Sequence, residues 1–287
     1  MYLEVKDVSK SYADFVAVDH VSLSVPEASI YGLLGPNGAG KTSLIRIINR
    51  ITRADSGEVL LQGKPMTDAD VRHIGYMPEE RGLYKKMKVS DQILYLGQLR
   101  GMKRADAQRA MDEWLERFQL TEWRDKKLEQ LSKGMAQKVQ FIATVIHRPS
   151  LLVFDEPFSG FDPLNADVLK REILRLRDEG AAILFSTHNM SSVEEICQEI
   201  TLINHARVVL QGNVGDIRQQ YKKHLMKVTT TDGRTFDYTL REGETMHDAV
   251  AHLNEEYELA GFQEILPSMH EVFVEAVTSS DRAKGSK

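Results

Sequence analysis

Residues 30–42 read "IYGLLGPNGAGKT", and this stretch decides the fold. Its first five residues form a continuous apolar run, which is typical of a strand buried on both faces. The following "TSLIRIINR" has the periodicity of a helix. Between them, "GPNGAGKT" at 35–42 fits the pattern G-x-x-x-x-G-K-[ST] and occurs where that motif must occur, between a buried strand and a helix start. The stretch therefore predicts a cradle for the phosphates of a nucleotide, because glycines let backbone N–H groups turn toward an anion at the positive end of a helix.

The residues of this motif have separate roles in the predicted cradle. Lys41 reaches the outer phosphates, and Thr42 offers a hydroxyl to Mg²⁺. A glycine-rich turn without a ligand is the alternative, and the strand-to-helix context disfavours it. The predicted nucleotide-binding residues are Gly35, Pro36, Asn37, Gly38, Ala39, Gly40, Lys41, Thr42 and Ser43.

Two further apolar runs end in residues that carry chemistry. In "LLVFDEP" at 151–157, Asp155 is placed to hold Mg²⁺ through water, and Glu156 is placed to orient or deprotonate a water. His188, in "FSTHN", follows the next buried run and would sense the terminal phosphate from the same edge of the sheet. A solvated acidic turn and a structural histidine are the alternatives. We predict Glu156, His188 and Lys41 as the catalytic residues, with Thr42 and Asp155 as metal ligands.

The remaining patterns predict an α/β protein with a P-loop ATPase core and a mostly parallel sheet. The runs "LLVFDE" and "AAILFSTH" are separated by the helix pattern at 163–180, which is a βαβ unit and implies parallel strands. The first sixty residues alternate as antiparallel strands do, and periodicity from Ser90 to about His147 is helical throughout, which predicts a helical insert at about 88–148. After residue 218, "KVTTTDGRTFDYTL" predicts a hairpin, followed by two short helices. We expect a core domain at 1–218 and a small α+β accessory domain at 219–287.

Composition limits the classes of partner. The 287 residues are 42% hydrophobic and 28% charged, and no run approaches the ~18 apolar residues of a membrane-spanning helix, so we expect a soluble, cytoplasmic chain. A formal net charge of -5 disfavours binding along a nucleic-acid backbone. The only cysteine, Cys197, is expected to be an apolar group without a chemical role.

Seven motifs in one order give the chain a family resemblance. Tyr12 after "VSKS", then "GPNGAGKT", "GYMPEERGLY", "LSKGM", "LLVFDEP", "SGFD" and "STHNM" resemble the nucleotide-binding subunit of an ATP-binding cassette (ABC) transporter over residues 1–218. The resemblance implies ATP and Mg²⁺ as ligands, stacking of Tyr12 on adenine, and ATP hydrolysis. It also implies a separate transmembrane permease, which would hold the chain on the inner face of the cell membrane.

The stretch "LSKGM" alone predicts no more than the start of a surface helix. In the family it is the signature motif, which acts on the ATP of the other subunit in a head-to-tail dimer. The resemblance therefore implies that Ser132 and the backbone of Gly134 face the partner's terminal phosphate. Lys133 and Met135 complete the motif, and Asp162 in "SGFD" resembles the loop that links the two sites.

Two departures from the family pattern stand out. The usual signature is Leu-Ser-Gly-Gly-Gln, and here Lys133 and Met135 occupy its third and fifth places. Glu79, in "MPEERG", replaces a glutamine that touches Mg²⁺, so it is a third candidate metal ligand that needs Arg81 or the metal as compensation. We expect Glu79 to stay clear of the metal until ATP closes the dimer.

"PEERGLY", "LSKG" and the C-terminal hairpin together resemble a bacterial export branch linked to sodium or drug efflux. The alternative function is a soluble ABC ATPase that acts on ribosomes or nucleic acid. A nucleotide switch without turnover is disfavoured by Glu156 beside Asp155.

Overall fold

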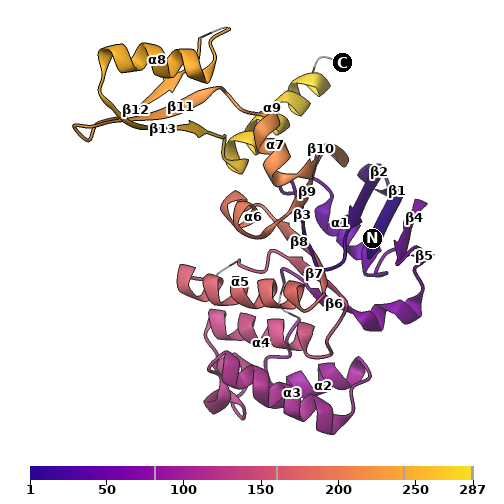
Figure 1. The fold of residues 1–287 in the computed structure, drawn as a ribbon. Helices are drawn as coiled ribbons and strands as arrows, with labels where there is room; N and C mark the ends of the chain where they lie inside the picture. Colours follow the sequence, from indigo (N-terminus) through magenta and orange to yellow (C-terminus); the bar gives the residue numbers. More distant parts are fainter. Residues whose placement is uncertain (81, 160, 242, 286–287) are drawn as a thin grey trace. The chain divides into compact units, whose positions relative to one another are not determined.

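The computed structural model describes residues 1–80, 82–159, 161–241 and 243–285 (Figure 1). Arg81, the expected charge partner of Glu79, and Gly160 of the "SGFD" loop lie outside these described residues. The chain divides into two compact units between Gln211 and Gly212, a few residues before the predicted boundary at 218. Each unit has its own sheet.

The first unit begins with a small antiparallel sheet in the order β2-β1-β4-β5. Alternate side chains of its strands, such as Val5 and Val21, are buried in a core that they share with Leu44 of helix α1. This burial explains the alternating pattern of the sequence and confirms the antiparallel N-terminal subdomain. The elements are β1 (Leu3–Tyr12), β2 (Phe15–Val25), β4 (Ser56–Leu61), β5 (Lys64–Pro65) and α1 (Lys41–Ile48).

The second sheet of this unit has six strands in the order β10-β9-β3-β8-β7-β6. The pairs β6–β7, β7–β8, β8–β3 and β3–β9 are parallel, as the βαβ pattern predicts. All residues of β3, β7 and β8 are buried, which accounts for their continuous apolar runs. The strands are β3 (Ile30–Leu34), β6 (Ile74–Met77), β7 (Leu151–Asp155), β8 (Ala182–Thr187), β9 (Glu199–Asn204) and β10 (Arg207–Asn213).

Strand register places the ends of three strands together. Leu34 pairs with Thr187, and Asp155 pairs with Ser186, so β3, β7 and β8 end at one edge of the sheet. The residues that follow these strands therefore leave the sheet side by side, although those after β3 are more than a hundred residues away in the chain from those after β7 and β8. Helix α5 (Pro163–Asp178) connects β7 to β8, and helix α6 (Met190–Ile196) connects β8 to β9.

Three helices form the insert between β6 and β7, and they lie together in Figure 1. They are α2 (Val89–Leu99), α3 (Arg104–Arg117) and α4 (Lys133–Val145). The stacked rings of Phe141 on α4 and Phe154 on β7, with centroids 5.5 Å apart, join the insert to the sheet. At Gly75 a Cβ would lie 2.6 Å from the carbonyl oxygen of Thr144, so the absence of a side chain lets α4 approach β6 closely.

The prediction of helical periodicity throughout the insert is wrong for residues 118–132. There the chain forms only short 3₁₀ turns, at Thr121–Trp123 and Leu128–Gln130. Its apolar side chains Phe118 and Leu120 are buried from turns rather than from one helical face. Spacing alone does not distinguish these two ways of burying the same residues.

The second unit, from Gly212, has a three-stranded antiparallel sheet in the order β12-β11-β13. The predicted hairpin is confirmed, because β11 pairs with β12 around a turn in which Gly233 has φ 84°. The buried side chains include Met226 and Val228 of the sheet and Leu253 of α8. The elements are α7 (Val214–Gln220), β11 (Leu225–Thr230), β12 (Thr235–Thr239), α8 (Met246–Glu256), β13 (Leu259–Ile265) and α9 (Met269–Gly285).

Two further features are the absence of a membrane-spanning helix among the described residues and the environment of Cys197. Within the described ranges, no helix has both the length and the apolar character needed to cross a membrane. Cys197 is buried, and burial raises the pKa of its thiol, so the group stays protonated and acts as a small apolar side chain.

Candidate functional site

A cavity of about 380 Å³ lies at the edge where β3, β7 and β8 end. It brings together the residues after each strand, including Lys41, Asp155, Glu156 and His188. The predicted cradle, the acidic pair and the histidine therefore share one site. Its described lining is Phe15, Ala17, Asn37, Gly38, Ala39, Gly40, Lys41, Thr42, Ser43, Glu79, Asp155, Glu156 and His188.

Two glycines of the cradle are required by the backbone. Gly35 has φ 150° and Gly40 has φ 114°, and both values disfavour any other residue. A Cβ would lie 2.2 Å from the carbonyl oxygen of Ile203 at the first position, and 2.1 Å from that of Ala17 at the second. Gly35 is absent from the cavity lining, so its role is to let the loop pack against β9.

Helix α1 presents its N-terminus to this cavity. It begins at Lys41, and among the described residues no side chain caps it at Gly40. The first N–H groups of a helix have no partner within the helix, and the helix dipole is positive there. Lys41, Thr42 and Ser43 all line the cavity, so the first turn of α1 lies where the predicted phosphate site requires it.

Lys41 is buried at the centre of the cradle. Its Nζ donates to the carbonyl oxygens of Gly35 at 2.7 Å and Pro36 at 3.1 Å. Burial lowers the pKa of Lys41, while the carboxylates of Glu156 and Asp155 act in the opposite direction. The ammonium group is thus held inside the loop, where a phosphate would replace the two carbonyl oxygens as its partner.

Thr42 and Asp155 lie close enough to share a ligand. The Thr42 hydroxyl donates to Oδ2 of Asp155 at 3.4 Å, and burial raises the pKa of the Asp155 carboxyl. Among the described residues, no three His, Cys, Asp or Glu side chains form a metal cage. A hydroxyl and a carboxylate beside a phosphate cradle nevertheless fit Mg²⁺, which is held by one or two protein oxygens and by the phosphates of its nucleotide.

Glu156 is fixed by contacts on both carboxylate oxygens. Its Oε1 lies 2.7 Å from Nδ1 of His188, and its Oε2 accepts a hydrogen bond from the Thr187 hydroxyl at 3.2 Å. The residue has φ 50°, and its N–H donates to the carbonyl oxygen of Ser186 at 2.9 Å. The His188 side chain is 66% exposed, whereas that of Glu156 is 10% exposed. A desolvated carboxylate with a fixed orientation suits the task of accepting a proton from water.

The predicted adenine-stacking residue, Tyr12, differs from the aromatic residue that lines the cavity. Tyr12 is 41% exposed and is absent from the cavity lining, whereas Phe15, its partner across the β1–β2 pairing, lines the cavity and is 59% exposed. Lys10 lies over the Tyr12 ring at 5.5 Å. The sequence analysis missed Phe15 and Ala17, although their alternation after the turn was a signal that these side chains share a face.

Glu79 lines the cavity as an exposed side chain. It shares this lining with Thr42 and Asp155 and contributes a third carboxylate to the site; whether it stays clear of the metal until ATP binds remains a prediction. Its negative charge opposes the lowering of the Lys41 pKa by burial and adds to the rise in the pKa of Asp155.

The four signature residues lie outside this cavity. Ser132 caps α4, and its hydroxyl accepts a hydrogen bond from the Met135 N–H at 3.2 Å. Lys133 is exposed, and the nearest neighbours of a Cβ at Gly134 would be 3.8 Å away. No backbone requirement explains this glycine. The start of α4 is therefore available to a ligand that the chain's own cradle does not hold.

Asp162 has a local structural role. It caps α5, where its two oxygens accept from the backbone N–H of Asn165 at 3.0 Å and from its side-chain amide at 2.6 Å. These bonds lower the pKa of Asp162, so the carboxylate is charged at neutral pH.

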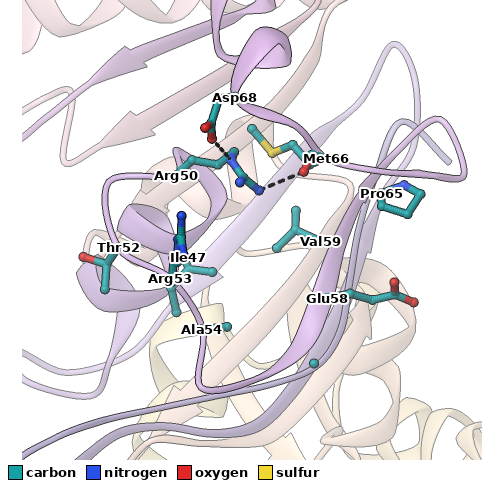
Figure 2. Close-up of a pocket in the computed structure, with 11 residues that line it drawn as sticks. Ile47, Arg50, Thr52, Arg53, Ala54, Glu58, Val59, Pro65, Met66 and Asp68 are labelled. Carbon is teal, nitrogen blue, oxygen red and sulfur yellow. Dashed lines mark hydrogen bonds and ion pairs between the residues drawn. The ribbon is translucent and has the colours of Figure 1, made fainter.

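A second cavity, of about 400 Å³, lies between the end of α1 and strands β4 and β5 (Figure 2). The Arg50 guanidinium in this cavity binds Asp68, with Nε and Oδ1 2.5 Å apart, and donates to the carbonyl oxygen of Met66 at 2.8 Å. This engagement and the absence of any cradle residue from its lining leave it outside the phosphate chemistry.

A parallel sheet whose strand ends carry a glycine cradle, a buried Asp beside a hydroxyl, a fixed Glu and a histidine defines a P-loop ATPase of the ABC class. The ABC transporter family profile matches residues 18–159. YhaQ of Bacillus subtilis (strain 168), an ABC transporter ATP-binding protein, is 38% identical over 96% of this chain and 98% of its own length. This chain belongs to that family, in which ATP hydrolysis is the general activity of the domain.

Two other comparisons agree with this assignment. The linearmycin resistance ATP-binding protein LnrL of Bacillus subtilis (strain 168) is 30% identical over 75% of this chain and 70% of its own. A solved ATP-binding subunit of an ABC transporter has a TM-score of 0.71 and 31% identity, and it covers 77% of this chain and 93% of its own. The predicted family and fold class are thus confirmed.

Proposed function

We propose that this chain is the ATP-hydrolysing motor subunit of an exporter, in which two copies close on ATP and drive a separate transmembrane permease. One observation carries the catalytic part of the proposal. Glu156 is held between His188 and Thr187 in the same cavity as the buried ammonium of Lys41. A base for water and a cation for the outer phosphates are thus arranged around one ligand.

The residues of the chain would act on ATP in a defined way. Lys41 exchanges its loop carbonyls for oxygens of the outer phosphates, and the first N–H groups of α1 hold the remaining charge. Thr42 and Asp155, with Glu79 nearby, would hold Mg²⁺, which neutralises phosphate charge. Glu156 accepts a proton from the attacking water as the bond between the terminal phosphorus and the leaving oxygen of ADP breaks. His188 keeps the carboxylate oriented.

The signature residues would act on the partner copy. Ser132 and Gly134 lie at the accessible start of α4 and outside their own chain's cavity, which supports a role in trans. Lys133 adds positive charge at the same helix end, where a terminal phosphate is favoured. Each composite site then consists of one chain's cradle and the other chain's signature.

A groove beside the Glu79 loop is the proposed docking place of the permease. This cavity of about 180 Å³ is lined by Pro78, Gly82, Leu83, Leu96 and Ala143, among others. The lining also includes Arg100, Gln140 and His147, so the groove suits a partner side chain with an apolar body and a polar end. Because Pro78 directly precedes Glu79, occupation of the groove would be felt at the nucleotide site.

The export direction is supported by the relatives rather than by the site. LnrL is named for resistance to linearmycin, which is consistent with removal of a compound from the cell. The cargo is expected to be selected by the permease.

Phosphate release by the purified chain with Mg²⁺ and ATP tests the catalytic part. We expect turnover that Lys41→Ala abolishes, because no other lysine or arginine stands among the described residues that line the cavity. Equal rates in wild type and Lys41→Ala would refute the assignment. Copurification with a membrane protein made from a neighbouring reading frame tests the permease part.

A further inference from the structure

Two buried glutamines of α4 fasten this helix to the two carboxylate-bearing loops of the catalytic cavity. Gln137 is 3% exposed, and its Nε2 donates to the carbonyl oxygen of Pro157 at 3.1 Å. Gln140 is 4% exposed, and its Nε2 donates to the carbonyl oxygen of Pro78 at 2.9 Å. The two residues are three positions apart on one helix, so their side chains leave neighbouring parts of its surface.

The two proline carbonyls are next to residues that line the site. Pro157 directly follows Glu156, and Pro78 directly precedes Glu79. A peptide unit held through its carbonyl oxygen cannot rotate without breaking that bond. Each amide therefore restricts the backbone from which one catalytic-site carboxylate projects.

Gln140 has one satisfied and one unsatisfied end, because its Nε2 reaches the Pro78 carbonyl whereas its Oε1 has no described partner. Its Oε1 is buried and has no hydrogen-bond partner in the part of the chain that the structure describes. An unsatisfied buried acceptor is destabilising, whereas an apolar side chain of similar shape would avoid that penalty. The donor on Nε2, which reaches the Pro78 carbonyl, is the feature that an apolar replacement would lack.

We infer that Gln137 and Gln140 are positioning residues that link the placement of α4 to the placement of Glu156 and Glu79. Because α4 starts at the signature residues, a helix that engages the partner's ATP is also bonded to the loops of its own site. The two sites of a dimer can then sense each other through α4. This inference rests on the proposed function, and it predicts separate effects for the two amides because they hold different carboxylates.

Replacement by methionine keeps the approximate shape and removes the donor. Gln137→Met should lower kcat between about tenfold and a hundredfold, because a displaced base is poorly aligned with water. ATP affinity should be retained, since the cradle is untouched. Gln140→Met should instead raise the Mg²⁺ concentration for half-maximal activity by about ten- to a hundredfold, the usual result of losing a group that orients a metal ligand. Activity should recover at high Mg²⁺.

Thr144→Val is the matched control. Thr144 is a buried residue of the same helix, and its hydroxyl donates to the backbone oxygen of Gln140 at 2.9 Å, so its loss removes a hydrogen bond within α4 alone. We expect the kcat and the Mg²⁺ dependence of Thr144→Val to match those of wild type, although its melting temperature falls about as much as that of the methionine variants. Should either methionine variant fold poorly, Gln137→Leu and Gln140→Leu remove the donor without placing a charge in the buried site.

The inference is overturned if both methionine variants keep wild-type kinetics, or if both show one common change that Thr144→Val shares. A purely structural role predicts such a common change, in which the active fraction falls while the half-saturating Mg²⁺ concentration stays constant. Failure of the proposed function gives a different result, because wild type and Lys41→Ala would then hydrolyse ATP equally and no variant would differ from them.

Discussion

Replacing Glu156 by glutamine separates hydrolysis from ATP binding in this site. The substitution keeps the size of the side chain and one acceptor oxygen, and it removes the charge and the basicity. In the structure, the carboxylate contacts His188 at 2.7 Å and Thr187 at 3.2 Å, and the cradle around Lys41 contains no atom of Glu156. The lost basic and hydrogen-bonding oxygen is therefore on the water-activating side of the cavity, and the effect on the cradle is electrostatic, because the Glu156 charge that acts to raise the pKa of Lys41 is removed.

The expected magnitudes differ between rate and stability. Loss of a positioned general base lowers the rate by about 10²–10⁴-fold, which corresponds to about 2.7–5.4 kcal/mol of transition-state free energy. At most one of the two carboxylate hydrogen bonds is lost, which changes the free energy of unfolding by about 0.5–1.5 kcal/mol. ATP affinity should be equal to or greater than that of wild type, because a negative charge beside the triphosphate is removed.

The assay combines steady-state phosphate release at saturating Mg²⁺ and ATP with binding of a fluorescent ATP analogue and gel filtration in ATP. We expect a strong loss of kcat, retained binding and a stable dimer that wild type forms only transiently. Wild-type turnover by Glu156→Gln would refute the assignment of this residue as the base. Loss of ATP binding together with turnover would show that Glu156 supports the cradle rather than the water.

Four further outcomes follow from the geometry. Ser132→Arg should bind nucleotide as a monomer but lack turnover. Mixing it with Lys41→Ala should restore part of the hydrolysis, because one composite site of the mixed dimer is then intact. Loss of nucleotide binding by the Ser132→Arg monomer would contradict a role in trans. Phe15→Ala should weaken ATP binding by about 0.5–1.5 kcal/mol, the value of an aromatic contact. An unchanged affinity in equilibrium binding would show that the adenine ring of ATP lies elsewhere. Glu79→Gln should raise the Mg²⁺ requirement, because one of the three carboxylates that attract the cation to the cavity is neutralised. An unchanged or lower requirement, measured by Mg²⁺ titration of activity, would show that Glu79 does not help to hold the metal. A chain ending at Asn213 should stay folded and hydrolyse ATP, because β10 ends there and the second unit has its own sheet; noncooperative melting by circular dichroism would place the boundary elsewhere.

Local patterns in the sequence were sufficient for several parts of this protein. The cradle at 35–42, the buried strands that end at Asp155 and Thr187, and the hairpin around Gly233 each depend on residues close together in the chain. Their periodicity and turn chemistry are properties of a few consecutive residues, so sequence predicts them. The family resemblance further implied that Ser132 and Asp162 belong to functional loops, and both begin helices in the structure.

Contacts between distant segments required the tertiary structure. The pairing of Glu156 with His188 depends on the register of β7 against β8, and the bonds from Gln137 and Gln140 depend on how closely α4 packs on β6 and β7. Nothing in the local pattern distinguishes these glutamines from ordinary polar residues on a helix. The pairing of β1 with β2 likewise decides that Phe15, rather than its cross-strand partner Tyr12, lines the cavity. Sequence determines which segments form strands and helices, whereas strand order, register and close packing determine which of their side chains meet, because those depend on interactions between residues far apart in the chain.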